Sequence, residues 1–208
     1  AKIMECLNIY KKEAKQELFS ILDYWIKYAV DDVNGGFIGK INNNNEKDFT
    51  APKGSVLNAR ILWTFSAAFN HYQNEKYFTT ATRAFEYITQ HFIDKDYGGV
   101  FWTVDANGNK LDDKKQIYAL AFTVYGLSEY YASSKNKIAL DTALQLYNTI
   151  EAYSYDVVNK GYFEAFKRDW SVADDLRLSA KDANEKKTMN THLHVIEAYV
   201  NLYKVYQS

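Results

Sequence analysis

Apolar residues recur along the chain in two patterns that distinguish two kinds of helix. The segments 75–92 and 136–150 each carry one apolar stripe with a polar back, as in the run Phe78, Ala81, Phe85, Ile88 and Phe92. One-sided stripes are typical of helices that cover the outside of a domain. The segments 55–69 and 116–131 are apolar nearly all round, which predicts helices buried on most faces. The chain therefore alternates outer and inner helices.

Glycine turns divide this helical pattern into repeats. Gly36, Gly99 and Gly161 each follow acidic or asparagine residues and precede aromatic or β-branched ones. That order predicts a turn leading into a short strand or hairpin. The markers lie 63 and 62 residues apart, and a fixed period of this size indicates a repeated supersecondary unit.

The repeat predicts an all-α toroid in which inner helices form a ring and outer helices form a shell. Each unit is an outer helix, a glycine hairpin and an inner helix, from a first outer helix near 5–30 to a last inner helix near 190–206. A closed ring of six such units needs roughly 370–400 residues. We therefore expect residues 1–208 to form half of one such toroid, with about six helices in outer/inner pairs and one apolar flank left without a neighbour.

Polar residues gather at the starts of the predicted inner helices, where a buried helix should avoid them. They are Asn58 and Arg60 in the first helix, Lys115, Gln116 and Tyr118 in the second, and Asn190, His192 and His194 in the third. If the inner helices run parallel, these ends converge on one mouth of the ring. Helix N-termini carry partial positive charge and free N–H groups, so the mouth suits an electron-rich ligand.

Each of these residues also has a purely structural interpretation. Arg60 would then pair with a carboxylate of the shell, Tyr118 would be one more core ring, and Lys115 and Gln116 would form a solvated first turn. The functional interpretation rests on their shared position at the helix starts, and the pattern leaves both interpretations open.

The two neighbouring histidines point to opposite sides of a helix. Residues two apart on a helix differ by about 200° in direction, so His192 and His194 cannot share one metal ion. His194 lies on a stripe with Asn190, Glu197 and Asn201, whereas His192 lies on an apolar face. That stripe faces either solvent or the mouth. We predict that His194 is a site residue and that His192 packs in the core.

Composition and charge narrow the class of protein. The formal net charge of −1 gives no overall attraction to nucleic acid or to an anionic membrane, and no apolar run is long enough to span a bilayer. The single cysteine, Cys6, excludes an internal disulfide, and the first residues lack a signal-peptide pattern, so we expect a cytoplasmic protein. The 18 Tyr, 12 Phe and 4 Trp suit either a core of bulky rings or a groove that stacks on sugars.

Three separated segments resemble the cellobiose 2-epimerases of the N-acylglucosamine 2-epimerase superfamily. They are APKGSVLNARILWTFSAAF, DYGGVFWTVDANGNKLDDKKQIYALAFTVYGLSEYY and KTMNTHLHVIEAY, and the likeness runs from about residue 5 to the C-terminus. The resemblance implies an α/α six-barrel isomerase that inverts C2 of a reducing-end sugar, such as a β-1,4-linked disaccharide. It implies ring opening and a cis-enediol, with no metal or nucleotide redox cofactor.

The same resemblance assigns roles to the residues at the mouth. It implies that Arg60, Tyr118, Asn190 and His194 bind the substrate, and that Arg60 and His194 also help catalysis by stabilising enediolate charge and polarising hydroxyls. The acid/base histidines of the family have no match in this chain.

Four other interpretations follow from the sequence. The first is a carbohydrate-binding half-barrel without catalysis, and the second is a self-associating half-barrel in which two chains close one ring. The third is another sugar epimerase or isomerase of the superfamily, and the fourth is a glycoside hydrolase on the same toroid. The resemblance implies that residues 1–208 are the N-terminal half of a single (α/α)6-barrel catalytic domain. A missing C-terminal half would then be the partner that completes the ring.

Overall fold

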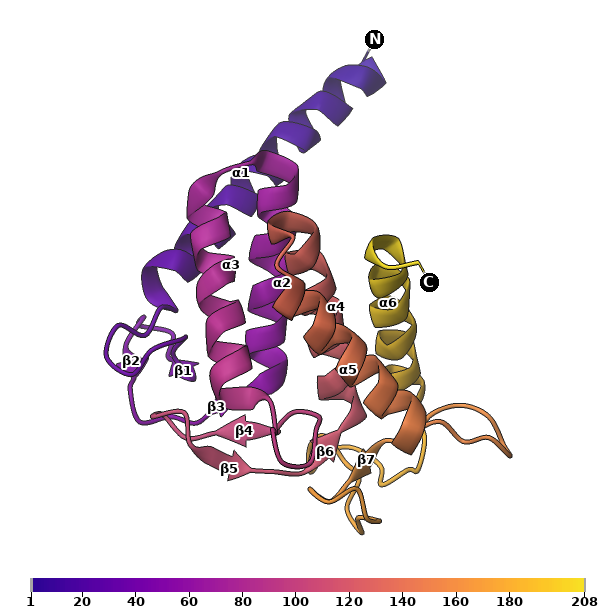
Figure 1. The fold of residues 1–208 in the computed structure, drawn as a ribbon. Coiled ribbons are helices and arrows are strands. Elements are labelled where there is room, and N and C mark those ends of the chain that lie inside the picture. Colours follow the sequence, from indigo (N-terminus) through magenta and orange to yellow (C-terminus); the bar gives the residue numbers. More distant parts are fainter. Residues whose placement is uncertain (1, 208) are drawn as a thin grey trace.

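The computed structural model describes residues 2–207 and shows three pairs of helices (Figure 1). The outer helices are α1 (Lys2–Tyr28), α3 (Glu75–Tyr87) and α5 (Lys137–Tyr153). The inner helices are α2 (Ser55–Tyr72), α4 (Ile117–Ser134) and α6 (Met189–Val205). A short π-helix, η1 (Ile88–Phe92), extends α3. The predicted alternation of outer and inner helices is confirmed.

Short strands lie together at one end of the molecule (Figure 1). They are β1 (Lys40–Ile41), β2 (Lys47–Asp48), β3 (Lys53–Gly54), β4 (Thr103–Val104), β5 (Lys110–Asp112), β6 (Lys115–Gln116) and β7 (Ala165–Phe166). They pair antiparallel as β1–β2, β3–β4–β5 and β6–β7. Because β3 leads directly into α2 and β6 into α4, and α6 starts at the same end, the inner helices run parallel from one mouth, as predicted.

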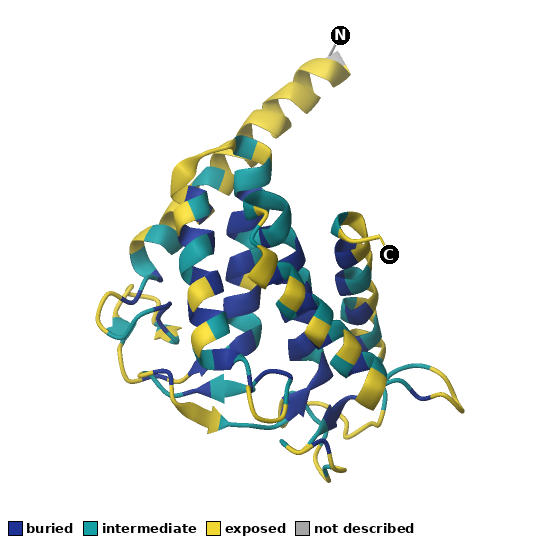
Figure 2. Ribbon diagram, viewed as in Figure 1, coloured by how far each residue is buried: buried dark blue, intermediate teal, exposed yellow. Residues whose placement is uncertain are grey.

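Helix α4 is the centre of the core and packs against α2 on one side and α6 on the other. Its buried residues occur all round the helix, which explains why its sequence shows no polar face (Figure 2). The closest approach is at Gly126, where a Cβ atom would lie 2.7 Å from the backbone oxygen of Ala59. A glycine is therefore needed here to let α2 and α4 pack closely.

We expect the substitution Gly126→Ala to destabilise the fold by about 1–3 kcal/mol, because the added methyl group overpacks a rigid backbone contact. Urea unfolding followed by circular dichroism measures the change. Gly54→Ala is the matched control, since its Cβ would meet no atom within 4 Å and its φ of −94° suits alanine. If Gly126→Ala lost no more stability than the control, α2 and α4 would be able to move apart and admit the methyl group without a loss of folding free energy.

Each repeat contains one aspartate–lysine ion pair that fastens the glycine turn to the following inner helix. The pairs are Asp31–Lys53 at 2.8 Å, Asp94–Lys115 at 2.6 Å and Asp156–Lys187 at 2.6 Å. In all three the lysine lies two residues before the first residue of the inner helix. The other carboxylate oxygen accepts two backbone N–H groups of the turn, as Asp94 does from Asp96 and Tyr97. One side chain thus shapes the turn and holds the helix start.

These pairs correct one interpretation of the sequence. Lys115 and Gln116 do not form a solvated first turn of α4, because both are buried in β6, where Lys115 binds Asp94. The Nε2 of Gln116 donates to the carbonyl oxygens of Leu176 and Arg177. Lys115 therefore anchors the second glycine turn and Gln116 anchors the loop at 176–177, and neither side chain is exposed at the mouth.

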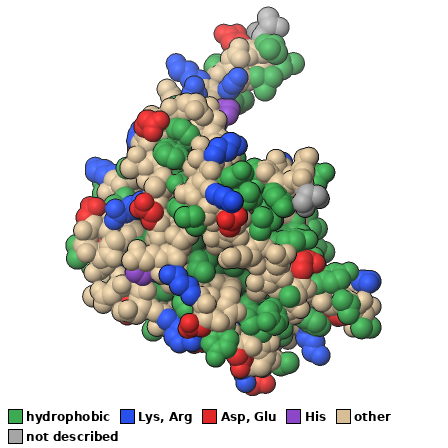
Figure 3. All heavy atoms as spheres, in the orientation of Figure 1, with side chains coloured by type: hydrophobic (Ala, Val, Ile, Leu, Met, Phe, Trp, Pro, Cys, Tyr) green, Lys and Arg blue, Asp and Glu red, His purple; other side chains and the backbone are tan. Residues whose placement is uncertain are grey.

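Apolar side chains remain exposed on the flanks of the two terminal helices. On α6 they include Leu193, Ile196, Val200 and Tyr203, each more than half exposed. The first half of α1 extends away from the body and also exposes apolar residues (Figures 1 and 3). The predicted unpartnered flank of the last inner helix is therefore confirmed. No helix within residues 2–207 is both long enough and apolar enough to cross a membrane.

Candidate functional site

Three of the four predicted site residues come together at the N-terminal mouth of the inner helices. Arg60 lies in the second turn of α2, Tyr118 in the first turn of α4 and His194 in the second turn of α6. The Tyr118 and His194 rings meet edge to face with their centroids 4.8 Å apart. Residues separated by more than 130 positions therefore form one cluster, because the three helices start at the same level.

Phe122 is the apolar centre of this cluster and was not assigned to the site from the sequence. Its ring lies 4.3 Å from the His194 ring and 5.0 Å from the Tyr118 ring, centroid to centroid. The guanidinium carbon of Arg60 lies 5.4 Å from its centroid, within range of a cation–π contact. Phe122 follows Tyr118 by one helical turn, so the i, i+4 spacing placed it on the same face.

The charges around Tyr118 oppose one another. Burial raises the pKa of the Tyr118 hydroxyl, the positive charge of Arg60 lowers it, and the negative charge of Glu197 raises it, with a net rise above its usual value. Tyr118 is therefore neutral at pH 7 and can donate a hydrogen bond to a ligand oxygen. Arg60 is exposed and makes no ion pair among the described residues, so the structure does not support pairing with a carboxylate of the shell.

His194 is held from within its own helix by Glu197. The Nδ1 atom lies 2.9 Å from Oε2 of Glu197, three residues later. The charge of Glu197 also acts on α4, where burial and then this negative charge raise the pKa of Tyr125. The predicted stripe through His194 therefore faces α4 and the mouth rather than open solvent. Glu197 was on that stripe in the sequence, but no role was assigned to it.

Asn190, the fourth predicted residue, lies outside this aromatic cluster. It is exposed at the start of α6, one turn before His194. It lines a small hollow of about 180 Å³ together with the loop residues Leu176 and Arg177. A ligand that touches both Asn190 and His194 would have to reach along the first two turns of α6.

His192 is half-buried and links α6 to the third glycine turn. Its Nε2 accepts a hydrogen bond from the backbone N–H of Tyr162 at 2.9 Å, and its Nδ1 lies 2.6 Å from the carbonyl oxygen of Thr188. A Cβ at Gly161 would approach this ring to 2.7 Å, so the glycine makes room for it. The structural role predicted for His192 is supported, although hydrogen bonds rather than apolar contacts hold the ring.

The interior of the ring continues below the mouth as a partly polar wall. The Trp63 and Tyr125 rings stack with centroids 5.0 Å apart and line a hollow of about 410 Å³. Further down, Asn201 donates to the carbonyl oxygen of Tyr125 and to the carboxylate of Glu129. The Trp63 Nε1 atom is buried without a hydrogen-bond partner within residues 2–207. Helical spacing from Arg60 and Tyr118 would have identified Trp63 and Tyr125.

His192 and His194 form hydrogen bonds with different partners, Tyr162 and Glu197. Across the described part of the chain, no group of three His, Cys, Asp or Glu side chains is arranged to hold a metal ion.

Parallel inner helices and an outer shell define the α/α-barrel class of protein, and cationic, hydroxyl and imidazole groups lie together at the mouth. The family model described as N-acylglucosamine 2-epimerase matches residues 36–207. The chain belongs to this family. The observed helices are those of half an (α/α)6 barrel, because the structure of a cellobiose 2-epimerase from Bacillus thermoamylovorans superposes with a TM-score of 0.92 at 40% identity, covering 97% of this chain and 52% of that one.

Two curated relatives are similar in sequence, with identities of 49% and 42%, against 40% for the solved structure. A cellobiose 2-epimerase of Bacteroides fragilis is 49% identical over 96% of this chain and 51% of its own length. One from Ruminococcus albus is 42% identical over 92% of this chain and 49% of its own length. The chain therefore spans about half the length of the curated relatives it matches.

Proposed function

We propose that residues 1–208 form the N-terminal half of the catalytic domain of a sugar 2-epimerase that interconverts cellobiose and 4-O-β-D-glucosyl-D-mannose. The observation that carries this proposal is the cluster of Arg60, Tyr118 and His194 at one mouth, in a chain 49% identical to a protein named cellobiose 2-epimerase. The exposed guanidinium, the neutral hydroxyl and the imidazole are suited to a ligand rich in hydroxyl groups.

Each residue has a role in this chemistry. Arg60 donates to the oxygens at C1 and C2 and stabilises the negative charge of the enediolate, which is largest when the C2 proton has left. Tyr118 donates a hydrogen bond from its neutral hydroxyl. His194 and, further out, Asn190 bind the hydroxyls around C1 to C3. We expect the two groups that remove and return the C2 proton to come from outside these 208 residues.

The proposal predicts sugar binding without epimerisation by this chain. Cellobiose added to the 15N-labelled chain should shift the amide signals around Arg60, Tyr118 and His194, because these residues line the mouth. In D2O the C2 proton of cellobiose should remain, and no glucosyl-mannose should form, because we expect the groups that transfer this proton to lie outside these 208 residues. Proton NMR and chromatography of the sugars measure both.

Methyl β-cellobioside is the matched ligand control, because its ring cannot open and it should bind more weakly. Absence of any shift at the mouth with cellobiose would contradict the proposed site. Loss of the C2 proton would show that these residues alone transfer it, and release of glucose would favour hydrolysis instead.

The exposed flank of α6 favours one second candidate, an assembly in which two chains close one ring. Leu193, Ile196, Val200 and Tyr203 form an apolar face suited to another helix. A monomeric mass in solution by light scattering would count against this assembly.

A further inference from the structure

Among residues 2–207, Glu197 is the one charged side chain that hydrogen-bonds to the imidazole of His194. The Nδ1–Oε2 distance is 2.9 Å, and the pair spans one turn of α6 with side chains 24% and 41% exposed. On the basis of the function proposed above, we propose that Glu197 is a positioning residue. It fixes neutral His194 in the tautomer with hydrogen on Nδ1 and so leaves the lone pair of Nε2 for a sugar hydroxyl.

The side chains around the His194 ring restrict its orientation and its tautomer. The ring centroids of Phe122 and Tyr118 lie 4.3 and 4.8 Å from that of His194, so the imidazole packs against two aromatic side chains. An ionised carboxylate only accepts hydrogen bonds, so the neutral ring must carry its hydrogen on the nitrogen that faces Glu197. Among the described residues, Nε2 of His194 has no hydrogen-bond partner, so it is the ring atom left for a ligand.

Glu197 also lies close to a second helix, α4. Tyr125 of α4 and Glu197 line the same hollow, and the pKa of the Tyr125 hydroxyl is raised by burial and then by the negative charge of Glu197. The carboxylate therefore lies near α4 and is hydrogen-bonded to the imidazole. A carboxylate bound to one ring nitrogen sets the tautomer and orientation of the ring and makes the other nitrogen a better acceptor.

His192 provides an internal reference on the same helix. Its Nε2 accepts from the Tyr162 N–H, so its Nδ1 must donate to the carbonyl oxygen of Thr188. The backbone alone therefore sets the tautomer of His192, without any contact to Glu197. The two histidines share a tautomer for different reasons, and only one of them should respond to a change at position 197.

The test is 15N NMR of the histidine rings in the sugar-free chain, at a pH where both imidazoles are neutral. We expect both His192 and His194 to show a protonated Nδ1 and an unprotonated Nε2. In Glu197→Ala the His194 signals should move toward the other tautomer, which free imidazole side chains prefer, while those of His192 stay unchanged. In Glu197→Gln the amide oxygen can still accept from Nδ1, so the original pattern should be largely restored.

Two results would overturn the proposal. One is an unchanged His194 pattern in Glu197→Ala, which would show that packing alone sets the tautomer. The other is a parallel change in His192, which would show that Glu197 supports the whole helix rather than one ring.

The NMR measurement needs no sugar, so its outcome is separate from that of the proposed function. In a second measurement, Glu197→Ala should weaken cellobiose binding about 2- to 10-fold, the worth of one misdirected hydrogen bond. If the unsubstituted chain binds no cellobiose but the tautomer still depends on Glu197, the positioning role stands and the epimerase proposal fails. Normal cellobiose binding by a Glu197→Ala chain with a changed tautomer would overturn the use of Nε2 in binding.

Discussion

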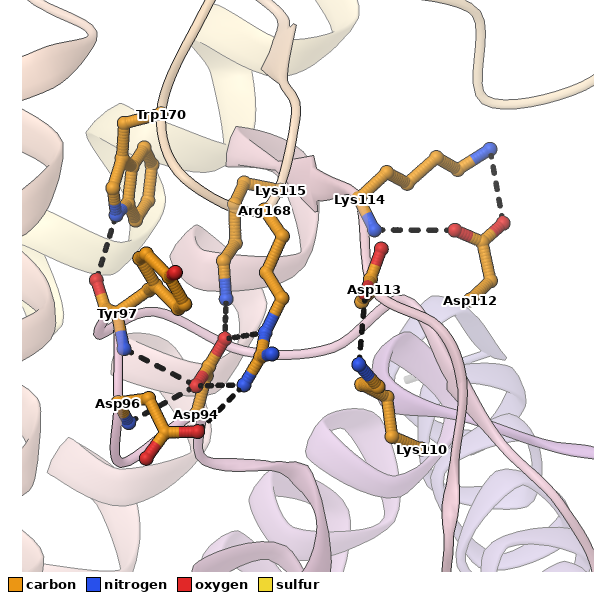
Figure 4. Close-up of polar contacts among 10 residues, drawn as sticks. All are labelled: Asp94, Asp96, Tyr97, Lys110, Asp112, Asp113, Lys114, Lys115, Arg168 and Trp170. Carbon is orange, nitrogen blue, oxygen red and sulfur yellow. Dashed lines mark hydrogen bonds and ion pairs between the residues drawn. The ribbon is translucent and has the colours of Figure 1, made fainter.

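The substitution Asp94→Ala is expected to cost about 3–5 kcal/mol of folding stability, a large part of what a domain of this size has. The carboxylate is fully buried and lies 2.6 Å from Nζ of Lys115, which is fully buried too (Figure 4). Arg168 donates to both of its oxygens. Removing Asp94 leaves the Lys115 ammonium in the core without a partner and frees the glycine turn. Urea unfolding at pH 7 measures the loss.

Two companion variants separate charge from other effects. Asp94→Asn keeps an oxygen that can accept from the turn, so a loss close to that of Asp94→Ala would assign most of the cost to charge. Asp96→Ala is the matched control, because its carboxylate contacts the same Arg168 but is 75% exposed, and we expect little change. A loss for Asp94→Ala no larger than for Asp96→Ala would contradict the importance of the buried pair.

The pH dependence gives a second check on the same network. Burial alone raises the pKa of Asp94, but hydrogen bonds from Arg168 and Lys115 outweigh it and hold the pKa well below its usual value. The stabilisation is therefore fully present above the unfolded-state pKa of about 3.9 and is lost as pH falls toward the folded-state value. The difference between the original chain and Asp94→Asn should shrink below about pH 4.

Periodicity alone was sufficient to predict the helices and their order. The one-sided stripe of α3 and the all-round apolar sequence of α4 reflect how much of each helix is buried, and burial is what the hydrophobic pattern records. The glycine spacing revealed the repeat because each turn needs positive φ at these positions, +64° at Gly36, +76° at Gly99 and +79° at Gly161.

The aspartate–lysine pairs were missed because their partners are distant in the sequence. Asp94 and Lys115 are 21 residues apart, and either one, taken alone, resembles an ordinary surface charge. The signal was nevertheless present, since Asp31, Asp94 and Asp156 repeat with the same spacing as the glycines. Aligning the three repeats on their glycines would have shown the aspartates in register.

The grouping of polar residues at the mouth was predicted from their places at the helix starts, but the residues that contact them were not predicted. Arg60, Tyr118 and His194 were found because polar residues at buried helix starts need a reason. Phe122 and Glu197 were not, because a phenylalanine in an apolar helix and a glutamate on a polar stripe each look ordinary. Their roles depend on contacts between helices that a single sequence does not contain.

The substitution Arg60→Ala is expected to weaken cellobiose binding about 10- to 100-fold, because hydrogen bonds to a charged donor contribute about 1.5–3 kcal/mol. Folding stability should change little, since Arg60 is exposed and its contact with Phe122 is at the surface of the mouth. Arg60→Lys keeps the charge and loses the planar fork of donors, so its affinity for cellobiose should lie between those of the unsubstituted chain and Arg60→Ala. Titration calorimetry and urea unfolding measure binding and stability separately.

His71→Ala is the matched control for Arg60→Ala, because it changes an exposed residue in the last turn of the same helix, at the end opposite the mouth. It should leave cellobiose binding unchanged. Equal losses of affinity in the two variants would mean that α2 contributes to binding only by being folded. A loss confined to Arg60→Ala, with the unfolding midpoint preserved, would place the guanidinium in contact with the sugar.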